Sequence, residues 1–148
     1  MNSEEGIMSG PYKGSCLCGS ITFEVDDFLP RTGNCHCSMC RKFHGAAFAT
    51  LAEARRDQFR WTSGEHMLKD YTAANGTVRT FCGNCGSSLM FFSPTETVDL
   101  VEIALGCFDD DIPVKPDAHI YLGSGAKWAY PKDELPKYEA GRDSARTS

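Results

Sequence analysis

Seven of the eight cysteines stand in three closely spaced groups, and this spacing constrains the fold more than any other feature. The groups are Cys16 with Cys18, then Cys35 with Cys37 and Cys40, and then Cys82 with Cys85. Closely spaced cysteines of this kind are typical of sites where thiolates bind zinc. The fold must therefore bring together sulfurs that lie far apart in the chain.

A disulfide framework is the alternative explanation for so many cysteines. The first ten residues, MNSEEGIMSG, are acidic and polar, unlike a secretory signal, so we expect a cytoplasmic, reducing location. Cysteines two positions apart, such as Cys16 and Cys18, are also too close to pair with each other in an extended chain. Both observations favour metal binding.

The number of sulfurs limits how metal ions can be shared. Seven cysteines in groups of two, three and two cannot form two closed four-thiolate sites, but they can form one closed site and one open site. The favoured partition joins the first pair to the last pair and keeps the triplet whole. A second partition, in which each pair takes part of the triplet, splits a compact group.

An open three-thiolate zinc site is typical of chemistry rather than of scaffolding. Three thiolates make the metal a poor Lewis acid, so it is better suited to holding an incoming thiolate than to generating hydroxide. Closure of the triplet site by Cys107 or by a histidine is the structural alternative. Cys107 stands alone in LGCFDD, which is more typical of a small buried apolar side chain than of a ligand.

Alternating apolar residues and glycine-rich connections predict a mainly β fold. Strands are expected over residues 20–25, 77–82, 87–92, 97–105 and 117–122. Residues 46–54 fit either a strand or a helix. A short helical turn is expected in SMCRKFHG, with Ser38 as its N-cap and Gly45 ending it.

Composition excludes two classes of function. The 148-residue chain is 41% hydrophobic and 24% charged, as in an ordinary globular domain, and has no apolar run of about 18 residues, so we expect no membrane partner. The formal net charge of −5 comes without a basic cluster, so a nucleic-acid partner is not expected.

Three motifs in order resemble the glutathione-dependent formaldehyde-activating enzyme family, whose domain is shared with centromere protein V. They are GSCLCGSITFEV, NCHCSMCRKFHGAAFAT and RTFCGNCGSSL, and AHIYLGSGAKWAYPKDELPKYE is similar to the family's closing segment. The resemblance implies a β-tent fold of stacked antiparallel sheets with zinc-binding hairpins. It covers residues 12–139, with flexible ends expected over 1–11 and 140–148.

The resemblance also implies two zinc ions and a reaction. The structural zinc falls on Cys16, Cys18, Cys82 and Cys85, and the labile catalytic zinc, which need not be fully occupied, falls on Cys35, Cys37 and Cys40. The implied activity is that of a carbon–sulfur lyase which joins a small thiol such as glutathione to an aldehyde such as formaldehyde. A non-catalytic zinc module that binds another protein on the same fold is the alternative.

Residues beside the triplet are candidates for catalysis and substrate binding. His44 follows Cys40 by four residues, so on a helix it lies on the same face and is the candidate acid or base. His36 points away from its neighbouring cysteines in an extended chain and is expected to be a packed or surface histidine rather than a catalytic one. The candidates for substrate binding are Arg41, Lys42, His119 and Trp128.

Overall fold

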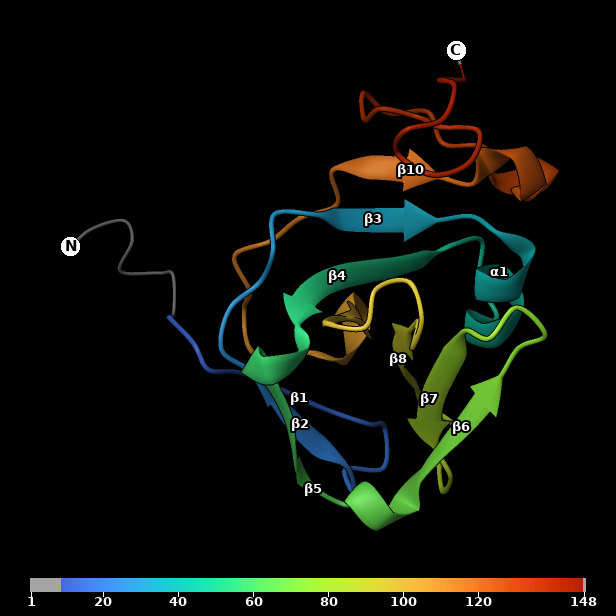
Figure 1. The fold of residues 1–148 in the computed structure, drawn as a ribbon. Coiled ribbons are helices and arrows are strands. Elements are labelled where there is room, and N and C mark those ends of the chain that lie inside the picture. Colours follow the sequence, from blue (N-terminus) through green and yellow to red (C-terminus); the bar gives the residue numbers. More distant parts are fainter. Residues whose placement is uncertain (1–8, 148) are drawn as a thin grey trace. The chain divides into compact units, whose positions relative to one another are not determined.

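The computed structural model describes residues 9–147, and within that range it is mainly β, which confirms the predicted class. Figure 1 shows the strands together with one α-helix, α1, and several short 3-10 turns among the described residues. Most of the predicted flexible N-terminus, residues 1–8, lies outside the described residues. No helix within 9–147 has the length and apolar character needed to cross a membrane.

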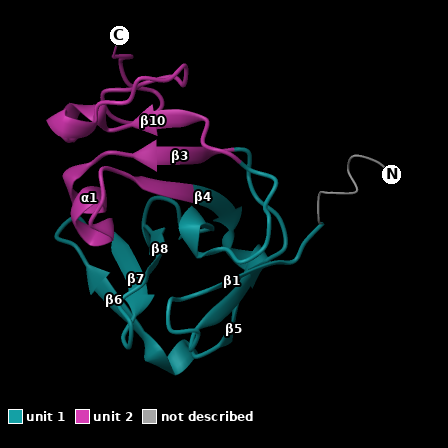
Figure 2. Ribbon diagram, turned by 180° about the vertical axis from the view of Figure 1, so that it is seen from behind, with its two compact units in different colours: residues 1–30, 52–114 teal, residues 31–51, 115–148 magenta. Residues whose placement is uncertain are grey.

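The described chain divides into two compact units, coloured separately in Figure 2. Unit 1 comprises residues up to 30 and residues 52–114, and unit 2 comprises residues 31–51 and 115–148. The strands of unit 1 are β1 (Tyr12–Ser15), β2 (Thr22–Val25), β5 (Phe59–Ser63), β6 (Leu68–Thr72), β7 (Val78–Cys82), β8 (Ser88–Phe92) and β9 (Leu100–Ala104). A single domain spanning 12–139 stays a prediction.

Unit 1 contains a three-stranded sheet, β1-β2-β5, and an antiparallel run in the order β9-β8-β7-β6. In β2 the alternation read from the sequence is confirmed, since Phe23 and Val25 are buried while Thr22 and Glu24 are half-buried. The buried side chains form one core cluster, whose members are Cys16, Ile21, Phe23, Val25, Ala54, Cys82, Leu89, Met90, Val101 and Ile103. Two of the grouped cysteines are therefore part of this core.

Among the described residues of unit 1, two 3-10 turns connect strands, η2 (Arg56–Gln58) and η3 (Glu65–Met67), and a third, η4 (Leu105–Cys107), follows β9. Strands β7 and β8 enclose the GNCG turn, as the sequence predicted. The turn closes with a hydrogen bond of 2.9 Å from the N–H of Gly86 to the Cys82 carbonyl. Gly86 adopts a φ of 83°, which glycine reaches without steric cost. This turn carries Cys85.

Unit 2 contains β3 (Thr32–Cys35), α1 (Ser38–His44), β10 (Ala118–Ile120), η5 (Leu122–Ser124) and η6 (Lys127–Ala129). β10 pairs with β3 in parallel, so His119 lies opposite Asn34. The strand β4 (Ala49–Arg55) begins in unit 2 and ends in unit 1, which resolves the ambiguity over residues 46–54 in favour of a strand. The strands predicted over 77–82 and 87–92 are confirmed as β7 and β8. The strands predicted over 97–105 and 117–122 are also present, but they are shorter than predicted and correspond to β9 and β10.

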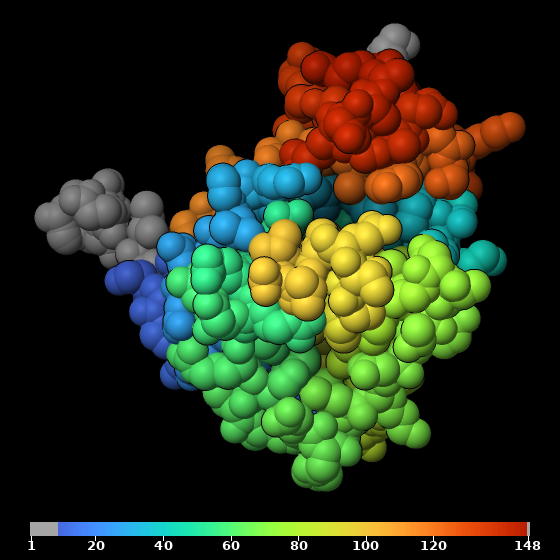
Figure 3. Space-filling view, viewed as in Figure 1, coloured from blue at the N-terminus to red at the C-terminus, as the bar shows by residue number. Residues whose placement is uncertain are grey.

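The C-terminal segment packs within unit 2. Figure 3 shows the last described residues, in red, as a compact mass beside the orange residues around β10. Tyr138 donates from its N–H to the His119 carbonyl at 2.9 Å, and Thr147 donates in the same way to Lys137 at 2.8 Å. The flexibility predicted for 140–148 stays a prediction, although residues 140–147 are hydrogen-bonded at several points.

Candidate metal centres

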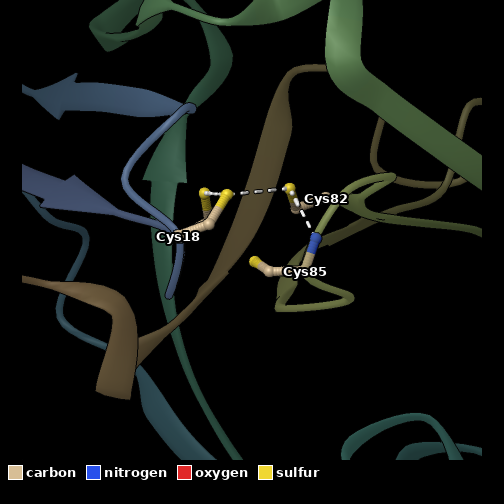
Figure 4. A group of neighbouring side chains, drawn as sticks. Cys18, Cys82 and Cys85 are labelled. Atoms are coloured by element: carbon tan, nitrogen blue, oxygen red, sulfur yellow. Dashed lines mark hydrogen bonds between the residues drawn. The ribbon is translucent and has the colours of Figure 1, made fainter.

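The structure brings together four sulfurs in unit 1, which are those of Cys16, Cys18, Cys82 and Cys85. Their Sγ atoms all lie within 4.8 Å of one another. Figure 4 shows Cys18 reaching towards Cys82, which ends β7, and Cys85, which lies in the connection between β7 and β8. This is the partition that kept the triplet whole.

Backbone amides surround these sulfurs. The N–H of Ile21 donates to Cys16 Sγ at 3.3 Å, and the N–H groups of Asn84 and Cys85 donate to Cys82 Sγ at 3.3 and 3.4 Å. A hydrogen bond with Ser87 lowers the pKa of Cys85 to about 5. Amide donors stabilise thiolates, so the local backbone favours the form of cysteine that binds metal.

The second group lies in unit 2, where Cys35 ends β3 and Cys40 lies in α1. The three Sγ atoms of Cys35, Cys37 and Cys40 again lie within 4.8 Å of one another. Cys35 and Cys40 are buried, and Cys37 is half-buried. An extended segment followed at once by a helix therefore gathers three sulfurs from only six consecutive residues.

Cys37, rather than Ser38, is the N-cap of α1, which corrects the sequence-based assignment. Cys37 is extended, with φ −64° and ψ 153°, and its Sγ accepts a hydrogen bond from the N–H of Cys40 at 3.2 Å. Ser38 is the first helical residue. The correction arises because sulfur here takes the role that serine or aspartate oxygen usually plays. Gly45 ends the helix with φ 62°, as predicted.

The three thiols of unit 2 do not ionise alike. Hydrogen bonds from Cys35 and Cys40 lower the pKa of Cys37, and the same hydrogen bond to Cys37, together with burial, raises the pKa of Cys35. Cys37 is also the least buried residue of the three. The shared hydrogen bonds therefore favour loss of the Cys37 proton over loss of the Cys35 proton.

The donor sets fit zinc. Four sulfurs match a closed tetrahedral site, and three match a site with one position left for another ligand. Within residues 9–147, neither a histidine nor a fourth cysteine joins the triplet. Cys107 belongs to neither group: its Sγ donates to the Ser88 carbonyl at 3.3 Å, and burial raises its pKa to about 11. Both clusters can therefore hold metal ions.

The other candidate residues lie at different depths. His44 is half-buried at the end of α1, four residues after Cys40, with its ring 5.1 Å from that of Phe43. Arg41 donates from Nη2 to the Ser124 carbonyl at 3.0 Å, while its Nε is buried and has no hydrogen-bond partner among the described residues. Trp128 is 77% exposed on η6. Lys42 is exposed on α1.

Comparison with known proteins agrees with this arrangement. The sequence model of the family described as glutathione-dependent formaldehyde-activating enzyme matches residues 11–124, which is most of the chain and includes both clusters. The chain belongs to this family.

Individual relatives support the assignment. A Halomonas elongata protein named "Putative glutathione-dependent formaldehyde-activating enzyme" is 31% identical over 123 residues, covering 78% of both chains. An uncharacterized lyase of Schizosaccharomyces pombe is 29% identical over 80 residues, covering 54% of this chain and 56% of its own. A crystal structure of a Rhodobacter sphaeroides protein aligns with a TM-score of 0.58 at 26% identity, covering 68% of this chain and 91% of that one.

In this member of the glutathione-dependent formaldehyde-activating family, His119 is 1% exposed and both of its ring nitrogens are hydrogen-bonded. One contact is to His36, also 1% exposed, and the other is to Asp133. The burial of His36 selects the packed alternative over the surface one, both of which the sequence left open. Sequence reasoning missed Asp133 because nothing in the spacing of three residues so far apart indicates that they meet.

Proposed function

We propose that this protein is a zinc-dependent enzyme of the carbon–sulfur lyase type, which joins a small thiol, such as glutathione, to an aldehyde, such as formaldehyde. The observation that carries the proposal is the triplet of Cys35, Cys37 and Cys40, which gathers three sulfurs and no fourth protein donor among the described residues. Membership of the family and the names of its relatives support the reaction class. The four-cysteine cluster would serve to stabilise unit 1.

Zinc held by the triplet would supply a site that keeps a thiol in its thiolate form at neutral pH. The chain's own residues have the remaining tasks. The reaction forms one carbon–sulfur bond: a sulfur lone pair attacks the carbonyl carbon, the π electrons move to oxygen, and the proton lost by the thiol ends on that oxygen. We assign movement of this proton to the imidazole of His44.

Substrate recognition would fall to the residues around α1. Arg41, whose Nη2 donates to the Ser124 carbonyl, would attract the carboxylate of a peptide-like thiol through its positive charge. Lys42, exposed on the same helix, adds a second positive charge. The exposed ring of Trp128 offers an apolar face for the rest of the substrate.

Metal content and turnover test the proposal together. Wild type should hold close to two zinc ions per chain, and Cys37→Ser should hold close to one with its fold retained. Addition of thiol to formaldehyde, followed by NMR exchange spectroscopy, should be accelerated by wild type and not by Cys37→Ser. Cys107→Ser is the matched control, because Cys107 belongs to neither cluster.

Two results would contradict the proposal. One is a Cys37→Ser variant that accelerates the reaction as well as wild type. The other is a cobalt-substituted protein whose visible spectrum does not respond to added thiol, which would instead favour a non-catalytic zinc module that binds another protein.

A further inference from the structure

A chain of three hydrogen-bonded side chains runs through unit 2 from the half-exposed Asp133 to His36, in the segment that carries the cysteine triplet. Asp133 Oδ2 lies 2.9 Å from His119 Nε2, and His119 Nδ1 lies 2.8 Å from His36 Nε2. Both imidazoles are 1% exposed, whereas the side chain of Asp133 is 47% exposed. His36 stands between Cys35 and Cys37 in the sequence, so the chain ends inside the metal-binding segment.

A single direction of hydrogen bonding follows when the carboxyl group of Asp133 is ionised and both imidazoles are neutral. An ionised carboxylate only accepts hydrogen bonds, so His119 must donate from Nε2 to Asp133. The Nδ1 of a neutral His119 then carries a lone pair and accepts from Nε2 of His36. The Nδ1 of a neutral His36, the ring nitrogen nearer its own backbone, is left as an acceptor.

Packing and backbone pairing hold both rings in place. The ring of Phe48 lies 4.8 Å from that of His36 and 5.8 Å from that of His119, measured between centroids. The N–H of His36 donates to the Ile120 carbonyl at 2.9 Å, and the N–H of His119 donates to the Pro136 carbonyl at 2.8 Å. Turning either imidazole to a new partner would disturb its packing against Phe48, and the two backbone bonds hold the main chain on which each ring stands.

We propose that Asp133, His119 and His36 form a positioning chain that sets the orientation of the Cys35–Cys37 segment. His36 is not a metal donor in this arrangement, since its Nε2 is engaged with His119. Holding the His36 ring fixes the side-chain torsions of His36. It thereby restrains the peptide units on either side of His36, which join Cys35 to Cys37. The consequence for metal binding rests on the proposed function, whereas the direction of the hydrogen bonds rests on the fold alone.

Nitrogen-15 NMR of the metal-free protein tests the direction of the chain. Two-bond correlations should identify both His36 and His119 as Nε2–H tautomers. In Asp133→Ala the acceptor is lost, so His119 should shift towards the Nδ1–H tautomer and His36 should change with it. Asp133 is half-exposed, so this variant should fold. An Nδ1–H tautomer of His36 in wild type, or no change in the variant, would overturn the proposal.

Cobalt titration tests the consequence. Asp133→Ala should weaken cobalt binding at the triplet by less than the about 10-fold to 100-fold that losing a direct hydrogen-bond partner of a ligand costs, and leave the four-cysteine site unchanged. Asp133→Asn keeps an acceptor oxygen and should retain more affinity than Asp133→Ala. Lys137→Met is the control, because it removes the other charged contact of Asp133, which is 3.2 Å long, and keeps the contact to His119.

The outcomes separate the two proposals. Equal cobalt affinity of wild type and Asp133→Ala at the triplet overturns the positioning chain and leaves the proposed function standing. A wild-type protein that binds only one cobalt ion overturns the proposed function, and the tautomers of His36 and His119 then decide by themselves whether the chain exists.

Discussion

Replacement of Cys82 by serine should cost unit 1 its fold. Cys82 is 0% exposed, belongs to the core cluster of unit 1, and is one of four sulfurs within 4.8 Å of one another. A structural zinc site contributes about 10–16 kcal/mol to folding. Whole domains are stable by only about 5–15 kcal/mol, so losing the metal removes as much free energy as the fold has.

Trp61 provides a spectroscopic signal for the folding of unit 1. Trp61 packs edge-on against Phe59 at 4.7 Å and against Phe23 at 5.9 Å, while Trp128 is 77% exposed. The near-ultraviolet circular dichroism of tryptophan therefore reports mainly on unit 1. We expect Cys82→Ser to lose this signal together with one zinc ion per chain.

The matched controls sharpen this result. Cys107→Ser alters a half-buried cysteine of the same unit that belongs to neither cluster, and its hydroxyl can still donate to the Ser88 carbonyl. Cys37→Ser removes a sulfur from the triplet in unit 2. Both variants should keep the tryptophan signal. A native signal and unchanged zinc content in Cys82→Ser would refute the structural role of the four-cysteine site.

Three further predictions concern stability and recognition. Gly64→Ala should lower the free energy of unfolding by more than about 1 kcal/mol, because Gly64 has φ +73° and an added Cβ would lie 2.1 Å from the Ser20 carbonyl oxygen. Gly106→Ala is the control, since an added Cβ there would meet nothing within 4 Å, and its free energy of unfolding should not fall by this amount when both variants are measured by urea titration. Ile103→Ala, at a site 1% exposed, should cost about 2–5 kcal/mol in the same assay. Trp128→Ala should change stability by less than about 0.5 kcal/mol yet raise the KM for thiol, and an unchanged KM would remove Trp128 from the substrate site.

The division of the cysteines into two clusters could be predicted because only a few divisions are possible. Seven sulfurs and the preference of zinc for four ligands leave one partition that keeps every group whole, and the structure brings the sulfurs together in that way. The mainly β class could likewise be read from alternation, as in β2. Both inferences use local spacing, which sequence displays directly.

Contacts between distant segments could not be predicted in this manner. His119 and His36 meet because β10 pairs with β3 in parallel, and Asp133 joins them through a segment without regular structure. No periodicity encodes a register between strands so far apart in the chain. The position of Phe48 against both imidazoles has the same origin.

The sulfur of Cys37 belongs at once to a cluster that can hold a metal ion and to a helix terminus. The spacing from Cys37 to Cys40 is that of an N-cap and the third helical residue, whose N–H it accepts at 3.2 Å. A serine at position 37 keeps a cap while removing a thiolate, whereas alanine removes both. Hydrogen exchange at the Cys40 amide should consequently be slow in wild type and in Cys37→Ser and fast in Cys37→Ala, so a single backbone proton distinguishes the loss of a ligand from the unwinding of the helix that carries it.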